Sequence, residues 1–311
     1  MHKVSVIGAG NVGATAAYYL AAKNFAEVVM VDVVPGLPQG KALDYLHASP
    51  ARGYNVPIVG TNEYDAIAGS DVVVHTAGIA RKPGMDRMDL LRTNVGIAKT
   101  AAENIVEYAP DAVVIVVSNP LDVIAMVMAR ATGFPRERVV GMAGILDSTR
   151  FRFFIAEKLG VLPSDVFAMV LGGHGDSMVP VSKYTTVGGF PLDELLSAEE
   201  IKALSDRTRT GGAEVINYLK TGSAYYAPAA SAVEMVQAVL KDEKLVAPAS
   251  ALLQGEYGYS DLYLGVPVLL GAGGLEKIYE LPLSEEEKGA LDRSVEAVRK
   301  GLADLAQIEA G

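Results

Sequence analysis

The sequence has no cysteine and only four histidines among its 311 residues. Without cysteine, the chain can form no disulfide bond, no thiolate metal site and no cysteine nucleophile. Four histidines offer little to a metal ion, so we expect no metal site. Proton transfer by an imidazole must come from one of these four side chains.

Positive charge is also scarce, with 27 Lys and Arg against 37 Asp and Glu, a net charge of −10. A nucleic-acid-binding protein needs a basic face, so we expect no nucleic acid partner. Apolar residues make up 50% and charged residues 21% of the chain, an ordinary globular composition. The length allows two domains with substantial cores.

The chain also lacks an uninterrupted apolar run long enough to span a membrane. The window 112–131 comes closest, but Ser118-Asn119-Pro120 and Asp122 interrupt it. That pattern fits a buried strand, a turn and a helix better. Met1-His2-Lys3 leads directly into the first apolar run and leaves no room for a signal peptide. We therefore expect a cytoplasmic protein with no membrane partner.

A glycine-rich turn stands between the first expected strand and the first expected helix. The apolar run Val4 to Ile7 precedes Gly8-Ala9-Gly10-Asn11-Val12-Gly13, and a helix is expected over 12–23. A second apolar run ends on Asp32 about 20 residues further on, the context that gives a GxGxxG motif its meaning. The glycines then allow a tight turn, a close approach of backbone amides to a pyrophosphate, and close packing of helix on sheet.

These features predict a dinucleotide site. The helix N-terminus presents unpaired N–H groups and a partial positive charge to phosphates. Asp32 would accept hydrogen bonds from the ribose hydroxyls of NAD and would repel a 2′-phosphate. The sequence therefore predicts NAD as the cofactor.

Two further apolar runs, 71–76 and 112–117, are continuous and indicate a parallel sheet covered on both faces. Strands and helices alternate as far as Val139-Val140, which predicts a Rossmann doubly wound sheet over residues 1–144. Residues 145–311 mix helices and strands differently, and we expect an α+β substrate-binding and catalytic domain there. Within it, Gly211-Gly212 should kink or break a helix over 198–219. The last helix should start at a capping box, Ser284 to Glu287.

His174 differs from the other three histidines because glycines flank it on both sides at the end of an expected strand. Such a loop exposes an imidazole to a cleft, where a pKa near neutrality suits a proton acceptor. Asp147 and Arg150 share one face of an expected helix. One alternative is that they form a local surface ion pair. The other is that they have separate roles in an active site, in which Asp147 orients His174 and Arg150 binds a carboxylate with two hydrogen bonds.

Arg81 and Arg87 bracket Pro83-Gly84 on a loop that could close over a ligand or be a solvated charged loop. Asn119 follows a buried strand and is either a turn residue or a donor to a carbonyl. Spacing alone does not separate these alternatives.

Over essentially its whole length the sequence resembles the lactate/malate dehydrogenase family, closest within it to the lactate-dehydrogenase-like malate dehydrogenases. Five motifs in the family's order carry the resemblance: IGAGNVG, TAGIARKPGMDRMDLL, VSNPLDV, GILDSTRFR and GGHGDSMVP. Members of the family are dimers or tetramers, so the resemblance implies a homodimer or a homotetramer.

The resemblance also assigns roles to residues. It implies that His174 is the proton acceptor with Asp147 as its partner, and that Arg150 binds the 1-carboxylate of the substrate. Arg87 would polarise the reacting carbonyl, and Asn119 would touch both substrate and nicotinamide. The cofactor-binding residues implied are Gly8, Ala9, Gly10, Asn11, Val12, Gly13, Asp32, Asn94, Val117, Ser118 and Asn119.

Arg81 is the discriminating residue within the family, because lactate enzymes carry glutamine there and malate enzymes carry arginine. A buried arginine with no carboxylate to pair with would be costly. The resemblance therefore implies the reaction of (S)-malate with NAD to give oxaloacetate and NADH. The pocket position that is threonine in many lactate enzymes corresponds to Ser223 or Ala224, which leaves the pocket width open.

Three alternatives remain at this point. The first is a lactate dehydrogenase, which would prefer pyruvate. The second is an NADH-sensing regulator, which needs a basic DNA-binding element that the sequence does not display. The third is an NAD-dependent glycosidase, which needs a metal site that this composition does not favour.

Overall fold

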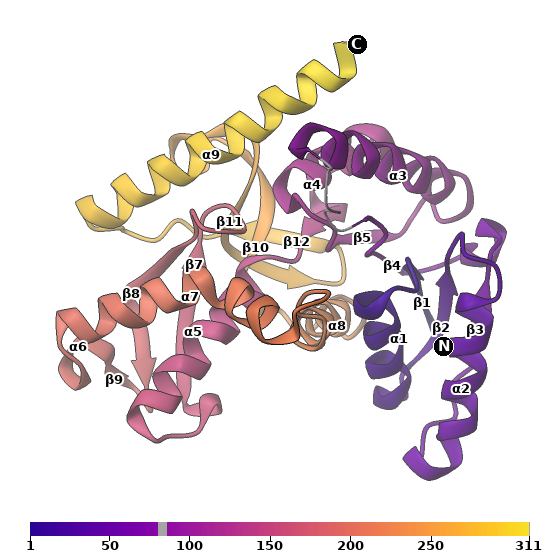
Figure 1. Cartoon of the computed structure of the whole chain (residues 1–311), viewed down its shortest axis with the longest axis horizontal. Helices are drawn as coiled ribbons and strands as arrows, with labels where there is room; N and C mark the ends of the chain where they lie inside the picture. Colours follow the sequence, from indigo (N-terminus) through magenta and orange to yellow (C-terminus); the bar gives the residue numbers. More distant parts are fainter. Residues whose placement is uncertain (80–85, 311) are drawn as a thin grey trace.

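The computed structural model of the chain describes residues 1–79 and 86–310 (Figure 1). The first half forms six parallel strands in the order β3-β2-β1-β4-β5-β6. Arg81 lies outside the described residues. The elements of this half are β1 (His2–Ile7), α1 (Asn11–Lys23), β2 (Ala26–Val31), α2 (Leu37–Arg52), β3 (Ile58–Thr61), β4 (Val72–His75), α3 (Arg87–Tyr108), β5 (Val113–Val116), α4 (Leu121–Thr132) and β6 (Val139–Gly141).

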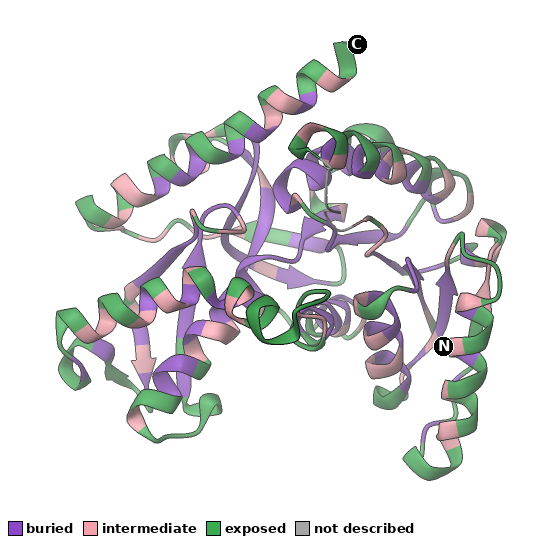
Figure 2. Cartoon of the chain, viewed as in Figure 1, coloured by how far each residue is buried: buried purple, intermediate pink, exposed green. Residues whose placement is uncertain are grey.

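Successive side chains of these strands enter two separate cores, because side chains of a strand alternate between its faces. Val4 and Val6 pack on the face covered by α1, whereas Ile7 packs on the face covered by α3 and α4. The cores on the two faces of the sheet are both apolar, and the strands between them are buried along nearly their whole length (Figure 2). The continuous apolar runs in the sequence reflect this double burial.

The second half extends the same sheet and adds a smaller one. Its antiparallel strands β10, β11 and β12 join the parallel strands where Ser250 on β10 pairs with Gly141 on β6, giving nine strands in all. A three-stranded sheet, β7-β8-β9, packs with α5, α6 and α7 (Figure 1). The elements are α5 (Gly144–Leu159), β7 (Val166–Leu171), β8 (Val179–Val187), β9 (Phe190–Pro191), α6 (Leu192–Leu195), α7 (Ala198–Leu219), α8 (Tyr226–Leu240), β10 (Leu245–Gln254), β11 (Ser260–Gly271), β12 (Gly274–Ile278) and α9 (Glu285–Ala310).

Helix α8 belongs to the second half of the sequence but covers the sheet of the first half, beside α1. Ala232, Val233 and Val236 of α8 are fully buried in the same core as Val4 and Val74. The two halves of the chain therefore share both a sheet and a core.

The predicted fold class, a Rossmann sheet followed by a mixed second domain, is confirmed. The capping box of α9 is also present, with Ser284 N–H donating to Glu287 and Glu287 N–H donating to the Ser284 hydroxyl. Of the kink or break expected at Gly211-Gly212, the break is wrong, since α7 continues through both residues. A Cβ on Gly211 would lie 3.3 Å from Arg150 Cδ, so these glycines bring α7 close to α5. In the described part of the chain, no helix has the length and apolar character needed to cross a membrane.

Candidate active site

The glycine-rich turn connects β1 to α1 at the carboxyl edge of the sheet. Gly8 has φ +100°, and a Cβ there would lie 2.7 Å from the amide nitrogen of Ala77. A Cβ on Gly13 would lie 1.8 Å from the carbonyl oxygen of Gly8. These two positions require glycine for conformation and packing. A Cβ on Gly10 would meet nothing within 4 Å, so that glycine faces open space.

Asp32 directly follows β2 beside this turn. Its Oδ2 accepts the amide N–H of Ala9 at 2.7 Å and its Oδ1 accepts that of Val34 at 2.9 Å. Lys41 of α2 donates to the carbonyl oxygen of Ala9 at 2.7 Å. Asp32 and Lys41 therefore hold both ends of the Ala9 residue.

In front of the turn lies a cavity of about 330 Å³. Eight of the predicted cofactor residues line it, namely Gly10, Asn11, Val12, Gly13, Asn94, Val117, Ser118 and Asn119. The open side of Gly10 and the unpaired amides at the start of α1 make this a cradle suited to the phosphates of a dinucleotide. Gly8, Ala9 and Asp32 lie at its edge, in the turn itself and at the end of the neighbouring strand.

Two of the lining side chains are used to hold the surrounding loops. Asn94 of α3 accepts the amide N–H of Ile79 at 2.8 Å and donates to the carbonyl oxygen of Asn119 at 2.9 Å. The Ser118 hydroxyl donates to the carbonyl oxygen of Ala77 at 2.7 Å. These hydrogen bonds tie the loop after β4 to the loop after β5, so both loops keep a defined position at the cavity wall.

A second cavity, of about 310 Å³, adjoins the first, and Val12, Val117, Asn119 and Ser223 line both. Its wall carries the charged side chains Arg150, His174, Asp176 and Arg209. Three predicted site residues, Asn119, Arg150 and His174, therefore meet at one cavity, although they span 55 positions of the sequence. A small polar substrate in the second cavity would therefore lie next to the nicotinamide ring of a dinucleotide held in the first cavity.

His174 and Asp147 form the central ion pair of this cavity. His174 Nδ1 lies 2.8 Å from Asp147 Oδ2, and Asp147 is only 2% exposed at its side chain. Burial of the imidazole lowers the pKa of His174, but the charge of Asp147 and the hydrogen bond with it outweigh burial, so the pKa lies above the ordinary value. Because Nδ1 faces Asp147, Nε2 is the ring nitrogen left to exchange a proton with a substrate.

Arg150 contacts the other oxygen of the same carboxylate, with Nη1 donating to Asp147 Oδ1 at 3.0 Å. The side chain remains partly accessible and lines the cavity. One buried carboxylate thus orients both the imidazole and a guanidinium. The remaining donors of Arg150 suit a second, incoming carboxylate.

His75, a second histidine buried inside the molecule, cannot serve as a proton acceptor. His75 on β4 is fully buried, and burial lowers its pKa to about 4. Neither of its ring nitrogens finds a hydrogen-bond partner within the part of the chain that is described. It is therefore a neutral core side chain, which leaves His174 as the imidazole at the cavity.

Arg87 occupies a different place from the other predicted site residues. It is the first residue of α3, and its Nη2 lies 3.3 Å from Asp304 Oδ2 on α9, with 59% of its side chain exposed. Arg87 is absent from the described lining of both cavities. A role at the reacting carbonyl would require its side chain to turn away from Asp304.

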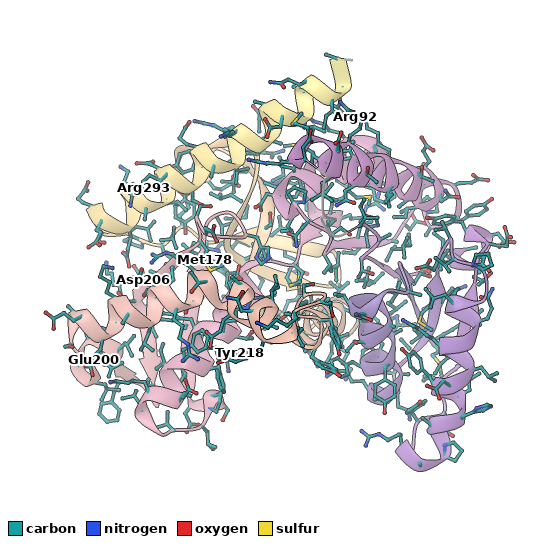
Figure 3. All side chains as sticks on the ribbon, viewed as in Figure 1. Arg92, Met178, Glu200, Asp206, Tyr218 and Arg293 are labelled. Carbon is teal, nitrogen blue, oxygen red and sulfur yellow. The ribbon has the colours of Figure 1, made fainter. Side chains whose placement is uncertain are left out.

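Arg209 lines the second cavity but was not selected from the sequence. Its Nε donates to the carbonyl oxygen of Met178 at 3.1 Å, and its Nη1 donates to Asp206 at 2.7 Å. Figure 3 labels both partners, Met178 and Asp206. No motif marks Arg209, because it lies on the side of a long charged helix and only the packing of α7 brings it to the cavity.

Two models of known protein families match the chain, one in each half. Residues 2–141 match the family model for the NAD binding domain of lactate/malate dehydrogenase, and residues 145–308 match the model for its alpha/beta C-terminal domain. The chain belongs to the lactate/malate dehydrogenase family. The expectations of family and of NAD as the cofactor are confirmed.

Individual relatives are similar over nearly their whole length. The chain is 57% identical to malate dehydrogenase of Thermomicrobium roseum over 306 residues, covering 98% of this chain and 99% of that protein. Its fold is similar to malate dehydrogenase from Picrophilus torridus in its apo form, with TM-score 0.96, 46% identity, and 99% and 98% of the two chains covered. It is also similar to lactate dehydrogenase from Cryptosporidium parvum complexed with lactic acid and NAD, with TM-score 0.94, 43% identity, and 100% and 98% covered. The fold alone therefore does not separate malate from lactate enzymes.

Proposed function

We propose that the protein is an NAD-dependent malate dehydrogenase, which interconverts (S)-malate and oxaloacetate, a step of the tricarboxylic acid cycle. The observation that carries the proposal is the buried Asp147 shared by His174 and Arg150 at a cavity adjoining the dinucleotide cradle. An imidazole of raised pKa beside a cation is the combination that a 2-hydroxy acid requires. Relatives named malate dehydrogenase at 50–57% identity support the choice of substrate.

In this mechanism, Nε2 of His174 takes the hydroxyl proton of malate, and Asp147 stabilises the imidazolium that forms. Arg150 binds the 1-carboxylate, and Asn119 contacts the substrate from the wall shared with the cofactor. A nicotinamide cofactor held in the cradle would supply the hydride acceptor for C2 of malate. In the reverse direction Arg87, turned inward, polarises the carbonyl of oxaloacetate.

The cofactor would be held by the turn Gly8, Ala9, Gly10, Asn11, Val12 and Gly13, by Asp32, and by Asn94, Val117, Ser118 and Asn119. Asp32 would exchange its bonds with the amides of Ala9 and Val34 for bonds with the ribose hydroxyls. Its charge would repel a 2′-phosphate, so we expect a strong preference for NADH over NADPH. Comparable kcat/KM for the two cofactors would contradict this assignment of Asp32.

We further propose that residues 1–144 form the NAD-binding domain and residues 145–311 the substrate-binding and catalytic domain. The protein would work in the cytoplasm as a homodimer or a homotetramer. Light scattering of the purified protein, at several concentrations, tests the oligomeric state.

Arg81 is assigned to the distal carboxylate of the four-carbon substrate. Arginine at this motif position supports malate rather than lactate as the substrate, because an unpaired arginine beside the methyl group of pyruvate would be costly. The test is a panel of oxaloacetate, pyruvate and other 2-keto acids with NADH, compared by kcat/KM. Oxaloacetate should be preferred strongly; a preference for pyruvate would make the protein a lactate dehydrogenase.

A further inference from the structure

The loop that carries His174 is held through three consecutive amide groups, each by a different element. The N–H of Gly172 donates to the carbonyl oxygen of Gly265 on β11 at 2.8 Å. The N–H of Gly173 donates to the Ser294 hydroxyl on α9 at 2.8 Å. The N–H of His174 itself donates to Asp122 Oδ2 on α4 at 3.0 Å. The backbone position of His174 is therefore determined from outside its own loop.

Asp122 is unusual among these three partners because it is a buried carboxylate. The residue is 6% exposed and lies in the first turn of α4, among apolar neighbours. Burial raises the pKa of Asp122, although hydrogen bonds from Ser250 and from the backbone of His174 act in the opposite direction. A buried acid is costly unless its oxygens are satisfied. Here Oδ1 accepts the Ser250 hydroxyl at 2.6 Å, and Oδ2 accepts the His174 amide.

Asp122 also lies three residues after Asn119, which lines both cavities. The turn before α4 thus carries a wall residue of both cavities, and the first turn of α4 carries the partner of the His174 amide. Packing around the loop is too tight for it to shift freely, since a Cβ on Gly173 would lie 3.3 Å from Asp122 Oδ2 and 2.8 Å from Val298 Cγ2.

From this arrangement we propose that Asp122 is a positioning residue, which sets the place of the His174 imidazole relative to the nicotinamide and substrate cavities. Ser250 is its support, because its hydroxyl fixes the rotation of the Asp122 carboxylate. The inference rests on the proposed dehydrogenase function and deepens it. Hydride and proton transfer tolerate little error in placement, and a displacement of about 1 Å can cost ~100-fold in rate. Asp122 should therefore act on kcat rather than on cofactor binding.

The test compares two substitutions with the same number of side-chain heavy atoms in the full-length enzyme. Asp122→Asn keeps an oxygen that can accept the His174 amide, whereas Asp122→Leu fills the space without an acceptor. We expect Asp122→Leu to lower kcat for 2-keto-acid reduction by about tenfold or more, and Asp122→Asn to stay within about threefold of wild type. The dissociation constant of NADH, from the fluorescence of the reduced nicotinamide on binding, should change less than about twofold in both, since the chain has no tryptophan to report on binding.

A primary isotope effect separates positioning from a loss of folded protein. With NADH deuterated at the transferred position, the isotope effect on kcat should rise in Asp122→Leu, because the chemical step becomes more limiting. A smaller active fraction leaves that ratio unchanged. Ser294→Ala is the matched control: it removes the partner of the neighbouring Gly173 amide and should disturb kcat less than Asp122→Leu does.

An unchanged isotope effect in Asp122→Leu, equal defects in the Asn and Leu variants, or an equal defect in Ser294→Ala would overturn the proposal. If Asp122→Leu yields no folded enzyme, Ser250→Ala takes its place. A normal kcat with a normal isotope effect in Ser250→Ala would then overturn the proposal. A wild-type preference for another 2-keto acid would overturn the malate assignment only. The Asp122 comparison is then made with that keto acid.

Discussion

The cofactor cradle and the second cavity, the proposed catalytic cavity, adjoin each other but are assembled in opposite ways. The turn and its acid, Gly8 to Asp32, come from one continuous strand–helix–strand unit. The catalytic cavity gathers Asn119, Arg150, His174 and Arg209 from four separate elements or the loops that follow them. The first site therefore depends on local backbone geometry, whereas the second depends on how the two halves of the chain pack.

The largest expected separation of the two sites comes from His174→Asn. Loss of the proton acceptor should lower kcat by about 10²–10⁴-fold while NADH binding stays near normal. Steady-state kinetics and fluorescence titration with NADH measure the two quantities. His47→Asn, at an exposed position on α2, is the matched control and should behave as wild type. Near-full turnover by His174→Asn would refute the assignment of the base.

Arg81→Gln tests substrate choice inside the catalytic cavity. It should reduce oxaloacetate turnover heavily and raise the relative activity on pyruvate, changing the preference by about 2–5 kcal/mol, because a desolvated ion pair is lost. Ser223 and Ala224 also shape the cavity, so the preference need not reverse completely. The measurement is kcat/KM for both keto acids at saturating NADH. An unchanged ratio would place Arg81 outside the substrate contacts.

A pair of glycine substitutions tests the cradle. Gly13→Ala puts a Cβ 1.8 Å from the Gly8 carbonyl oxygen and should cost about 1–3 kcal/mol in unfolding free energy. Gly10→Ala meets no protein atom within 4 Å, so it should leave thermal unfolding unchanged and weaken NADH binding. Equal unfolding temperatures for the two variants would contradict the packing argument. Normal NADH affinity in Gly10→Ala would contradict the position of the phosphates.

The smallest expected effect is a shift in pH dependence. In the proposed mechanism, reduction of oxaloacetate needs protonated His174, so activity should be present below the pKa of His174 and lost as pH rises through it. Burial lowers the pKa of His174 and Arg150 acts in the same direction, but the charge of Asp147, with a smaller contribution from Asp122, holds this pKa above its ordinary value. Asp147→Asn should therefore move the alkaline limb of the kcat/KM profile to lower pH, besides lowering kcat. An alkaline limb that stays in place would show that another group controls the profile.

The same contrast explains what could be predicted from the sequence. The glycine-rich turn and Asp32 could be predicted because their chemistry lies within one short segment. His174 and Asp147 are 27 residues apart, and spacing left their 2.8 Å contact as one of two alternatives until the resemblance to a family favoured it. Ser250 and Asp122 are 128 residues apart, and no periodicity links them. The one available signal was Asp122 itself, a charged residue in an apolar window.

The error at Gly211-Gly212 has the complementary cause. Glycine lowers the intrinsic stability of a helix, and this led to the expectation of a break. In the folded chain the missing side chains let α7 approach Arg150 and Phe154 on α5. The packing gained there outweighs the local preference, which a sequence pattern does not report.

The position of α8 has a consequence for how the protein is made. A ribosome releases the strands of the first half long before residues 226–240, yet those residues cover the apolar face that includes Val74 and Ile115. Until α8 emerges, the part of that face that α8 covers is open to water and to other chains. The nascent first half must therefore persist with part of one sheet face uncovered, and burial of that face is completed only after two-thirds of the chain has been synthesised.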